Sequence, residues 1–190
     1  MTKILFDPGH SYLKLGAPSH WLGLNEHDLK LIQARAAYKI LQEQKFEIQI
    51  LDPDIDDLVK IGTQAAACDA FVSFHLNSCL DAGVNYTTVC LHETKSKNAS
   101  KRLGSQLILA LIKTIQIAPY RGPFGPGLMY LPLKVLSAAE NACKGPCVLT
   151  EAFFVSSETW KTQDELKRQA EKAGVCIGQT IANYFATTKR

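Results

Sequence analysis

The sequence predicts a single α/β domain with a mostly parallel, twisted sheet of about six strands and helices on both faces. Two observations lead to this fold class. Short apolar or β-branched runs, such as AFVSF and CVLTEAFFV, have the composition of strands that are buried on both faces. These runs alternate with segments of helical periodicity, as in strand–helix–strand units. A length of 190 residues suits one domain of ordinary size over residues 1–190, with no linker, repeat or separate binding module.

The predicted strands occupy six segments of the chain. They comprise residues 3–6, 47–51, 70–76, 85–92, 133–137 and 146–154. Asp7-Pro8-Gly9 follows the first segment, and proline and glycine favour a turn at that point.

A first helix is predicted over residues 25–44. Apolar side chains recur there at the spacing of one helix face, at Leu29, Ile32, Ala36 and Ile40. Asn25 is a favourable N-cap, and Asp28 stands three residues later, where it can complete a capping box. These signals indicate where the helix begins.

Two further helices follow from the same periodicity. Residues 96–116 place four aliphatic side chains on one face, at Leu103, Leu107, Leu111 and Ile115. Thr162 and Glu165 form a T-x-x-E capping box, after which apolar positions keep the helical period to the end of the chain. Residues 117–133 contain four prolines and three glycines, which predicts a long irregular loop and a candidate rim of a binding groove.

Composition argues against two classes of partner. The 21 Lys and Arg and 18 Asp and Glu are scattered, without the basic tract expected of a nucleic-acid-binding protein. No stretch reaches the roughly 18 apolar residues of a membrane span. The N-terminal segment before Asp7 is too short for the apolar region of a signal peptide, so we expect synthesis in the cytoplasm. Nothing in the pattern demands a dimer, and a monomer is expected.

The six cysteines are predicted to be reduced and mostly buried thiols. They stand at positions 68, 79, 90, 143, 147 and 176, with no CxxC pair and no zinc-finger spacing. Cys143 and Cys147 flank Lys-Gly-Pro, so a local disulfide between them is an alternative.

Three residues with acid–base or metal-binding chemistry stand at or near predicted strand ends. His10 follows the first strand in DPGH, His75 ends the third in SFHLNS, and Glu151 interrupts the apolar run VLTEAFF. A parallel sheet gathers such positions at one edge, and burying a carboxylate is costly unless it has a partner. Two histidines and one or two carboxylates form a ligand set suited to Zn²⁺. A turn-capping role is the alternative for His10.

The motifs and their order resemble one enzyme family. DPGH is followed by NEHDL at a helix start, then by CDAFVSFHLNS, RG and GPCVLTEAFF. In this order they are similar to the zinc-dependent N-acetylmuramoyl-L-alanine amidases of the amidase-3 family, and the similarity extends from Leu5 to Tyr184. The resemblance implies a catalytic domain that acts on peptidoglycan or muropeptides, as in an autolysin or endolysin.

The resemblance also implies the roles of four residues. His10, Glu26 and His75 would be the zinc ligands, and Glu151 the catalytic carboxylate. The implied reaction is hydrolysis of the amide between N-acetylmuramic acid and L-alanine, at the cell wall after release or export. Zinc would activate a water molecule, and Glu151 would accept its proton and return it to the leaving amine.

Other polar residues have two possible roles each. Asp7 could orient a ligand imidazole or form the turn. Asn77 could contact substrate or end its strand, and Arg121 could pair with a stem-peptide carboxylate or be structural. The remaining histidines, at 20, 27 and 92, are expected not to be ligands.

The chain also departs from the family pattern. A TR pair that often follows the second strand is replaced by ILDPDIDDL, and Ala152 stands where a glycine is usual after Glu151. Two alternatives therefore stay open. One is a zinc amidase or peptidase for soluble muropeptides or other peptides, and the other is a non-catalytic domain that binds peptidoglycan.

Overall fold

The computed structural model describes residues 1–10, 14–19, 21–51 and 57–188. Its centre is a six-stranded sheet in the order β2-β1-β3-β8-β4-β7. The strands of this sheet are β1 (Lys3–Asp7), β2 (Glu47–Ile50), β3 (Ala70–Asn77), β4 (Thr88–His92), β7 (Leu128–Leu131) and β8 (Cys147–Phe154). All neighbouring strands are parallel except β4 and β8, which are antiparallel. The predicted fold class is thus confirmed.

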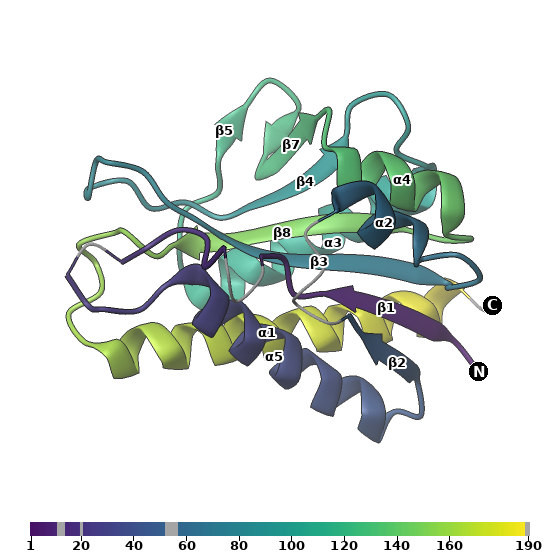
Figure 1. Cartoon of the computed structure of the whole chain (residues 1–190), viewed down its shortest axis with the longest axis horizontal. Coiled ribbons are helices and arrows are strands. Elements are labelled where there is room, and N and C mark those ends of the chain that lie inside the picture. Colours follow the sequence, from purple (N-terminus) through teal and green to yellow (C-terminus); the bar gives the residue numbers. More distant parts are fainter. Residues whose placement is uncertain (11–13, 20, 52–56, 189–190) are drawn as a thin grey trace.

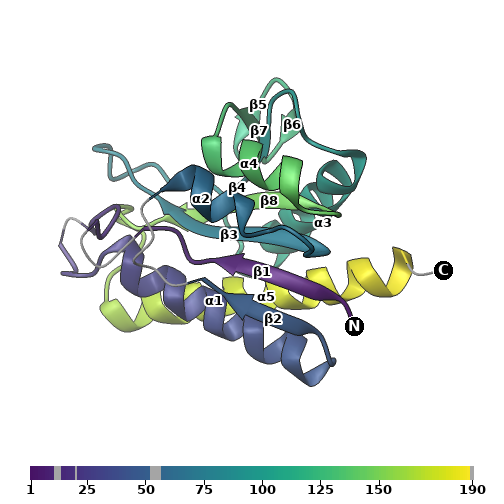
Figure 2. The same ribbon diagram turned by 45° about the vertical axis from the view of Figure 1, so that its right-hand side comes forward.

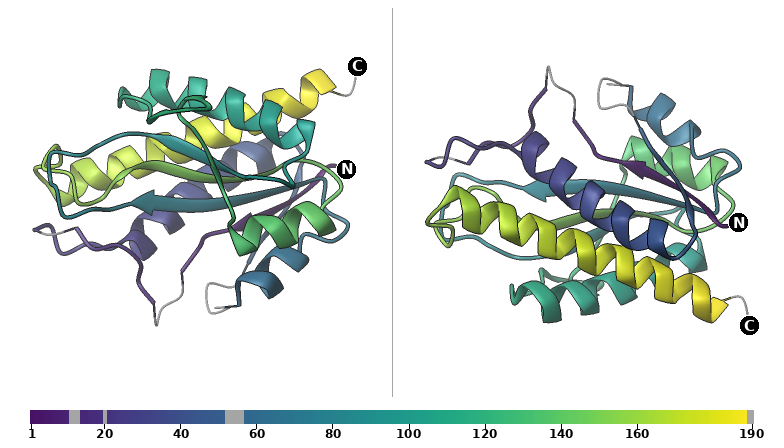
Figure 3. Two further views of the ribbon diagram at one scale, coloured as in Figure 1. Left: turned by 90° about the horizontal axis from the view of Figure 1, so that it is seen from above. Right: turned by 90° about the horizontal axis from the view of Figure 1, so that it is seen from below.

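Within the described residues, five helices cover the two faces of the sheet. They are α1 (Glu26–Glu43), α2 (Leu58–Thr63), α3 (Asn98–Ile115), α4 (Lys134–Ala142) and α5 (Gln163–Thr188). Figures 1 and 3 show α1, α3 and α5 on one face and the shorter α2 and α4 on the other. Each face has its own apolar core, and the larger core lies under α1, α3 and α5. Buried apolar side chains on both faces explain the continuous apolar runs in the strands.

The predicted capping signals form as expected. The Asn25 side chain accepts a hydrogen bond from the backbone N–H of Asp28, whose carboxylate accepts one from the N–H of Asn25. Thr162 and Glu165 make the same reciprocal pair at the start of α5. These bonds satisfy N–H groups that a helix start leaves without partners.

The prediction of a strand at 133–137 was wrong. These residues lead into and begin α4, where Val135, Leu136 and Ala139 are buried at helical spacing. The sixth strand is instead β7, which lies within the segment predicted to be a loop and pairs in parallel with β4. That segment also holds a small hairpin of β5 (Arg121–Gly122) and β6 (Gly125–Pro126). A short apolar run does not by itself distinguish a strand from a buried turn of helix.

The topology brings three chain segments to one edge of the sheet. The strands β1, β3 and β8 are neighbours and run in the same direction, so their carboxyl ends lie together. The start of β1 and the end of α5 lie toward the opposite end (Figure 2). Open parallel sheets bind ligands beyond the carboxyl ends of their strands, which makes this edge the place to look for a site.

Candidate active site

Two histidines and a glutamate meet at this edge. Nε2 of His10 lies 3.0 Å from Oε2 of Glu26, and Nδ1 of His75 lies 3.0 Å from the other carboxylate oxygen, Oε1. The two imidazole rings stand edge to face, with centroids 4.9 Å apart. One ligand atom from each residue can be chosen so that all lie within 4.8 Å of one another. The structure therefore brings together the three residues for which metal binding was predicted.

Glu26 is the first residue of α1 and is buried. Its Oε2 accepts a hydrogen bond from the backbone N–H of Ala17, and its Oε1 accepts one from the N–H of Leu76. Burial alone would raise the pKa of Glu26, but the hydrogen bonds from His10 and His75 hold it well below its usual range. The carboxylate is thus ionised and fixed in orientation, as a metal ligand must be.

The pKa of His75 depends on the carboxylates around it. Burial alone would lower the pKa of His75, but the hydrogen bond to Glu26 and the charges of Glu151 and Glu26 raise it overall. The carboxylates around this imidazole therefore favour a positive charge at His75.

The DPGH loop is held by Asp7. Its Oδ1 accepts a hydrogen bond from the N–H of Gly9 at 3.0 Å, and its Oδ2 accepts one from Oγ of Ser73 at 2.6 Å. These contacts are those of the turn-forming alternative for Asp7. The loop also needs glycine, because Gly9 has φ of +47° and a Cβ there would collide with Nε2 of His75.

Lys30 is a site residue that sequence reasoning missed. Its side chain is fully buried, and its Nζ donates to the carbonyl oxygen of His10 at 2.6 Å. Burial lowers the pKa of Lys30 to about 8, although the charges of Asp7 and Glu26 raise it. Its spacing was the available signal, because a lysine four residues after Glu26 lies on the same helix face.

Glu151 lies in β8, directly opposite His75 in the register of β3 and β8. Its Oε2 is buried and has no hydrogen-bond partner among the described residues. Burial raises the pKa of Glu151 to about 8; the charge of Glu26 raises it further and His75 opposes the shift. A buried carboxylate oxygen without a partner is costly, which makes Glu151 a candidate for contact with a cation, a water molecule or substrate.

The other predicted residues lie outside this cluster. Asn77 ends β3, and its Oδ1 accepts a local hydrogen bond from the N–H of Ser78. Arg121 is exposed in the β5–β6 hairpin and lines a separate cavity of about 360 Å³ that none of the four main candidates reaches.

The remaining histidines are not part of the cluster as described. Nδ1 of His92 accepts hydrogen bonds from the backbone of the following turn. His27 is buried in α1, and His20 lies outside the described residues.

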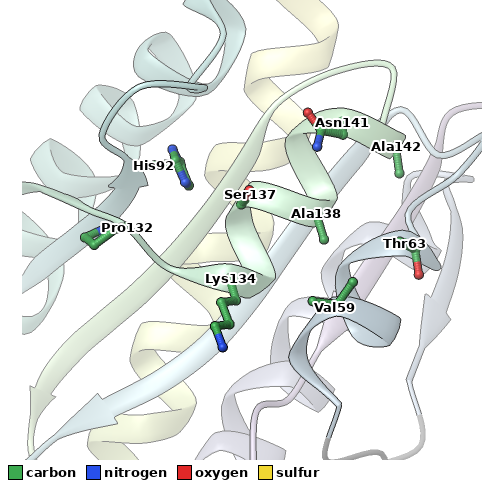
Figure 4. A pocket seen from close by; sticks show the side chains of 9 residues that line it. All are labelled: Val59, Thr63, His92, Pro132, Lys134, Ser137, Ala138, Asn141 and Ala142. Atoms are coloured by element: carbon green, nitrogen blue, oxygen red, sulfur yellow. The ribbon is translucent and has the colours of Figure 1, made fainter.

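Two cavities lie beside α2 and α4. The smaller one, of about 230 Å³, is lined by Asp7, Gly9, His10, Lys14, Leu58, Ile61, His75 and Val135. The larger one, of about 380 Å³, lies between the two helices and includes His92 and Lys134 but none of the four main candidates (Figure 4). The site chemistry therefore belongs to the smaller cavity.

The cysteines add no nucleophile to this cluster. Cys143 and Cys147 are not joined by a disulfide, so the alternative of a local disulfide is wrong. Burial, together with the charge of Glu151, strongly raises the pKa of Cys90.

A parallel-sheet edge that gathers two imidazoles and two carboxylates beside a cavity has the chemistry of a metal-assisted hydrolase. Residues 4–183 match the model of the Amidase_3 family, described as N-acetylmuramoyl-L-alanine amidase, and the chain belongs to this family. This confirms the resemblance and the enzyme class, an amide hydrolase of peptidoglycan. No curated protein sequence matches the chain significantly.

Solved structures of amidases share the fold. The catalytic domain of CwlV from Bacillus (Paenibacillus) polymyxa var. colistinus superposes with a TM-score of 0.77 at 21% identity, covering 98% of this chain and 99% of that one. CwlD from Clostridioides difficile, solved with the GerS lipoprotein, gives 0.79 at 17% identity, covering 98% and 100%. The catalytic domain of the CD27L endolysin, which targets Clostridia difficile, gives 0.71 at 14% identity, covering 96% and 98%.

Among the described residues, no helix combines the length and the apolar content that crossing a bilayer requires.

Proposed function

We propose that this chain is a zinc-dependent amidase that cleaves the bond between N-acetylmuramic acid and L-alanine at the cell wall, with His10, Glu26 and His75 holding the zinc and Glu151 moving the proton. The observation that carries the assignment of Glu151 is its buried Oε2, which lies opposite His75 and has no hydrogen-bond partner in the part of the chain that the structure describes. Family membership supports the reaction.

The chemistry of the residues fits the ion. Two imidazoles and one ionised carboxylate are the ligand types that catalytic zinc takes in proteins, with a further position left for water or substrate. When bound, zinc supplies a Lewis acid that polarises the amide carbonyl and lowers the pKa of water. The backbone N–H groups of Ala17 and Leu76 donate to the two carboxylate oxygens of Glu26, and these contacts orient the carboxylate without a metal.

Glu151 holds and transfers the proton in this proposal. Its Oε2 accepts the proton of the attacking water and then donates it to the nitrogen of L-alanine as the amide bond breaks. A carboxyl group whose environment raises its pKa toward neutrality can do both steps near neutral pH. General acid–base transfer of this kind contributes about 10²–10⁴-fold to the rate.

The test compares Glu151→Gln with the wild type and with Glu171→Gln, an exposed residue of α5. Zinc content by elemental analysis and release of L-alanine amino groups from peptidoglycan are measured on each. We expect Glu151→Gln to keep its zinc and lose at least about 100-fold in rate, with Glu171→Gln unchanged. An active wild type without metal, or an active Glu151→Gln, would contradict the proposal.

A further inference from the structure

Three aromatic rings gather on the Glu151 side of the sheet. The ring of Tyr86 stands edge to face against Phe154, with centroids 4.5 Å apart, and lies 5.2 Å from the ring of Tyr120. Phe154 is buried, whereas the two tyrosines are only half-buried. The cluster therefore has a fixed base and two rings that retain solvent-exposed surface.

The backbone around Tyr120 is built to hold this arrangement. The N–H of Tyr120 donates to the carbonyl oxygen of Thr87, and the N–H of Gly127 donates to the carbonyl oxygen of Tyr120. A Cβ at Gly122 would collide with the Tyr120 ring, so glycine at this position leaves room for the ring. The two tyrosines thus come from separate chain segments that are tied together by backbone bonds.

The register of the strands places this cluster beside the candidate catalytic carboxylate. Thr88 is the direct partner of Glu151 across β4 and β8, and Tyr86 stands two residues before Thr88, just ahead of the start of β4. The charge of Glu151 is among the causes that raise the pKa of Tyr86, after burial and the neighbouring Tyr120 and Cys79. The rings therefore lie on the β4 side of Glu151.

The other side of the site has a different surface. On the side of β1 and β3, the cavity next to His10 and His75 has aliphatic walls from Leu58, Ile61 and Val135. In the strand order, β8 with Glu151 lies between β3 and β4. One flank of the reacting centre is thus aromatic and the other is aliphatic.

These two flanks match the two sides of the amide bond in the proposed substrate. A pyranose ring presents flat faces of C–H groups, which pack on the faces of aromatic rings, and tyrosine combines such a face with a polar hydroxyl. An alanine-containing peptide presents small methyl groups that suit an aliphatic cavity. We infer that Tyr86 and Tyr120 form a saccharide-binding wall for the muramoyl sugar, and that the peptide lies toward Leu58, Ile61 and Val135. This inference rests on the proposed function.

The experiment uses the zinc-loaded protein and two matched substrates, N-acetylmuramoyl-tripeptide and the same tripeptide acylated with lactate alone, which lacks the sugar ring. Tyr86→Leu and Tyr120→Leu remove the rings, and Tyr86→Phe keeps one. Tyr130→Leu is the control, because that tyrosine is also half-buried but pairs with Phe124 and packs toward the core on the other face. Circular dichroism and thermal unfolding confirm that each variant folds.

We expect both leucine variants to raise KM for the sugar-bearing substrate about five- to twentyfold and to leave kcat/KM for the lactyl peptide unchanged. Tyr130→Leu should behave as the wild type does, whereas Tyr86→Phe, which keeps the ring and loses the hydroxyl, should raise KM less than Tyr86→Leu does. Equal losses on both substrates, or no change on the sugar-bearing one, would overturn the inference.

A second measurement separates this inference from the proposed reaction. Binding of N-acetylmuramic acid is measured by calorimetry, which needs no turnover, and should weaken by a similar factor in Tyr86→Leu and Tyr120→Leu. If the wild type cleaves neither substrate but the two leucine variants bind the sugar more weakly than it does, the proposed function alone is contradicted. Cleavage with unchanged sugar binding in both leucine variants contradicts the saccharide-binding wall alone.

Discussion

Nζ of Lys30 donates to the carbonyl oxygen of His10 at 2.6 Å from a fully buried position. Lys30 lies one turn after Glu26, so a single helix face supplies one candidate ligand and holds the backbone of another. His10 has a φ of +40°, a conformation that needs support from its surroundings. Lys30 is therefore a positioning residue of the candidate metal centre.

Replacing Lys30 with methionine is expected to weaken zinc binding by about tenfold or more, because contacts around a ligand are worth about 10–100-fold in affinity. The metal-free fold should be retained, since an apolar chain of similar length avoids the cost of burying an ammonium. Competition with a chromogenic chelator measures the affinity. Lys39→Met, an exposed position on α1, is the control and should bind zinc as the wild type does. Equal affinity in Lys30→Met would remove its positioning role.

Gly9→Ala should disturb the site through a steric clash. The new methyl group would meet Nε2 of His75 and would also occupy a left-handed backbone conformation, so we expect a loss of about 1–3 kcal/mol in unfolding free energy and weaker zinc binding. Gly23→Ala is the matched control, because Gly23 has φ of +65° but, apart from its chain neighbours, no described residue comes closer than 3.9 Å to its Cβ position. Urea unfolding measures the stability of both variants, and competition with a chromogenic chelator measures their zinc affinity. Similar losses in stability and zinc affinity for the two variants would show that backbone strain, and not contact with His75, is responsible.

The metal-free protein should lose stability as the pH rises, in part through Glu151. Its carboxyl has a pKa of about 8 in the folded state and about 4.5 when unfolded. The folded state therefore binds one more proton between these values, and this contribution to stability is fully present below about pH 4.5 and lost as the pH passes through 8. Glu151→Gln removes the effect. From pH 5 to pH 8, the unfolding free energy of the variant should therefore rise relative to that of the wild type by on the order of 3 kcal/mol.

Urea unfolding of both proteins in the presence of a chelator, at pH 5 and pH 8, measures this difference. A constant gap between the wild type and the variant at the two pH values would mean that Glu151 is ionised in the folded protein throughout. Zinc added at pH 8 should stabilise the wild type, since a ligand that binds only the folded state shifts unfolding by mass action.

Much of the fold could be predicted because its signals are local. Buried strands such as 70–76 and 146–154 are continuous apolar runs, and the caps at Asn25 and Thr162 are defined within a few residues. Residues 133–137 were predicted as a strand and not as the start of α4, because this apolar segment is too short to show a helical repeat. β7 was missed because its strand character depends on pairing with β4, which is remote in the sequence.

The candidate site was predictable only in part for a similar reason. His10, His75 and Glu151 stand out because polar groups interrupt or follow apolar strands. Glu26 does not, because a glutamate at a helix start is ordinary, and only the family resemblance singled it out. Lys30 was missed because its importance comes from burial against a distant loop.

The most direct test of the zinc centre is a crystal structure of the zinc-loaded protein measured at the zinc absorption edge. We predict one anomalous peak per chain, at about 2.0–2.2 Å from a nitrogen of His10, a nitrogen of His75 and an oxygen of Glu26. A fully loaded, active protein whose only peak lies away from these three residues would contradict the account.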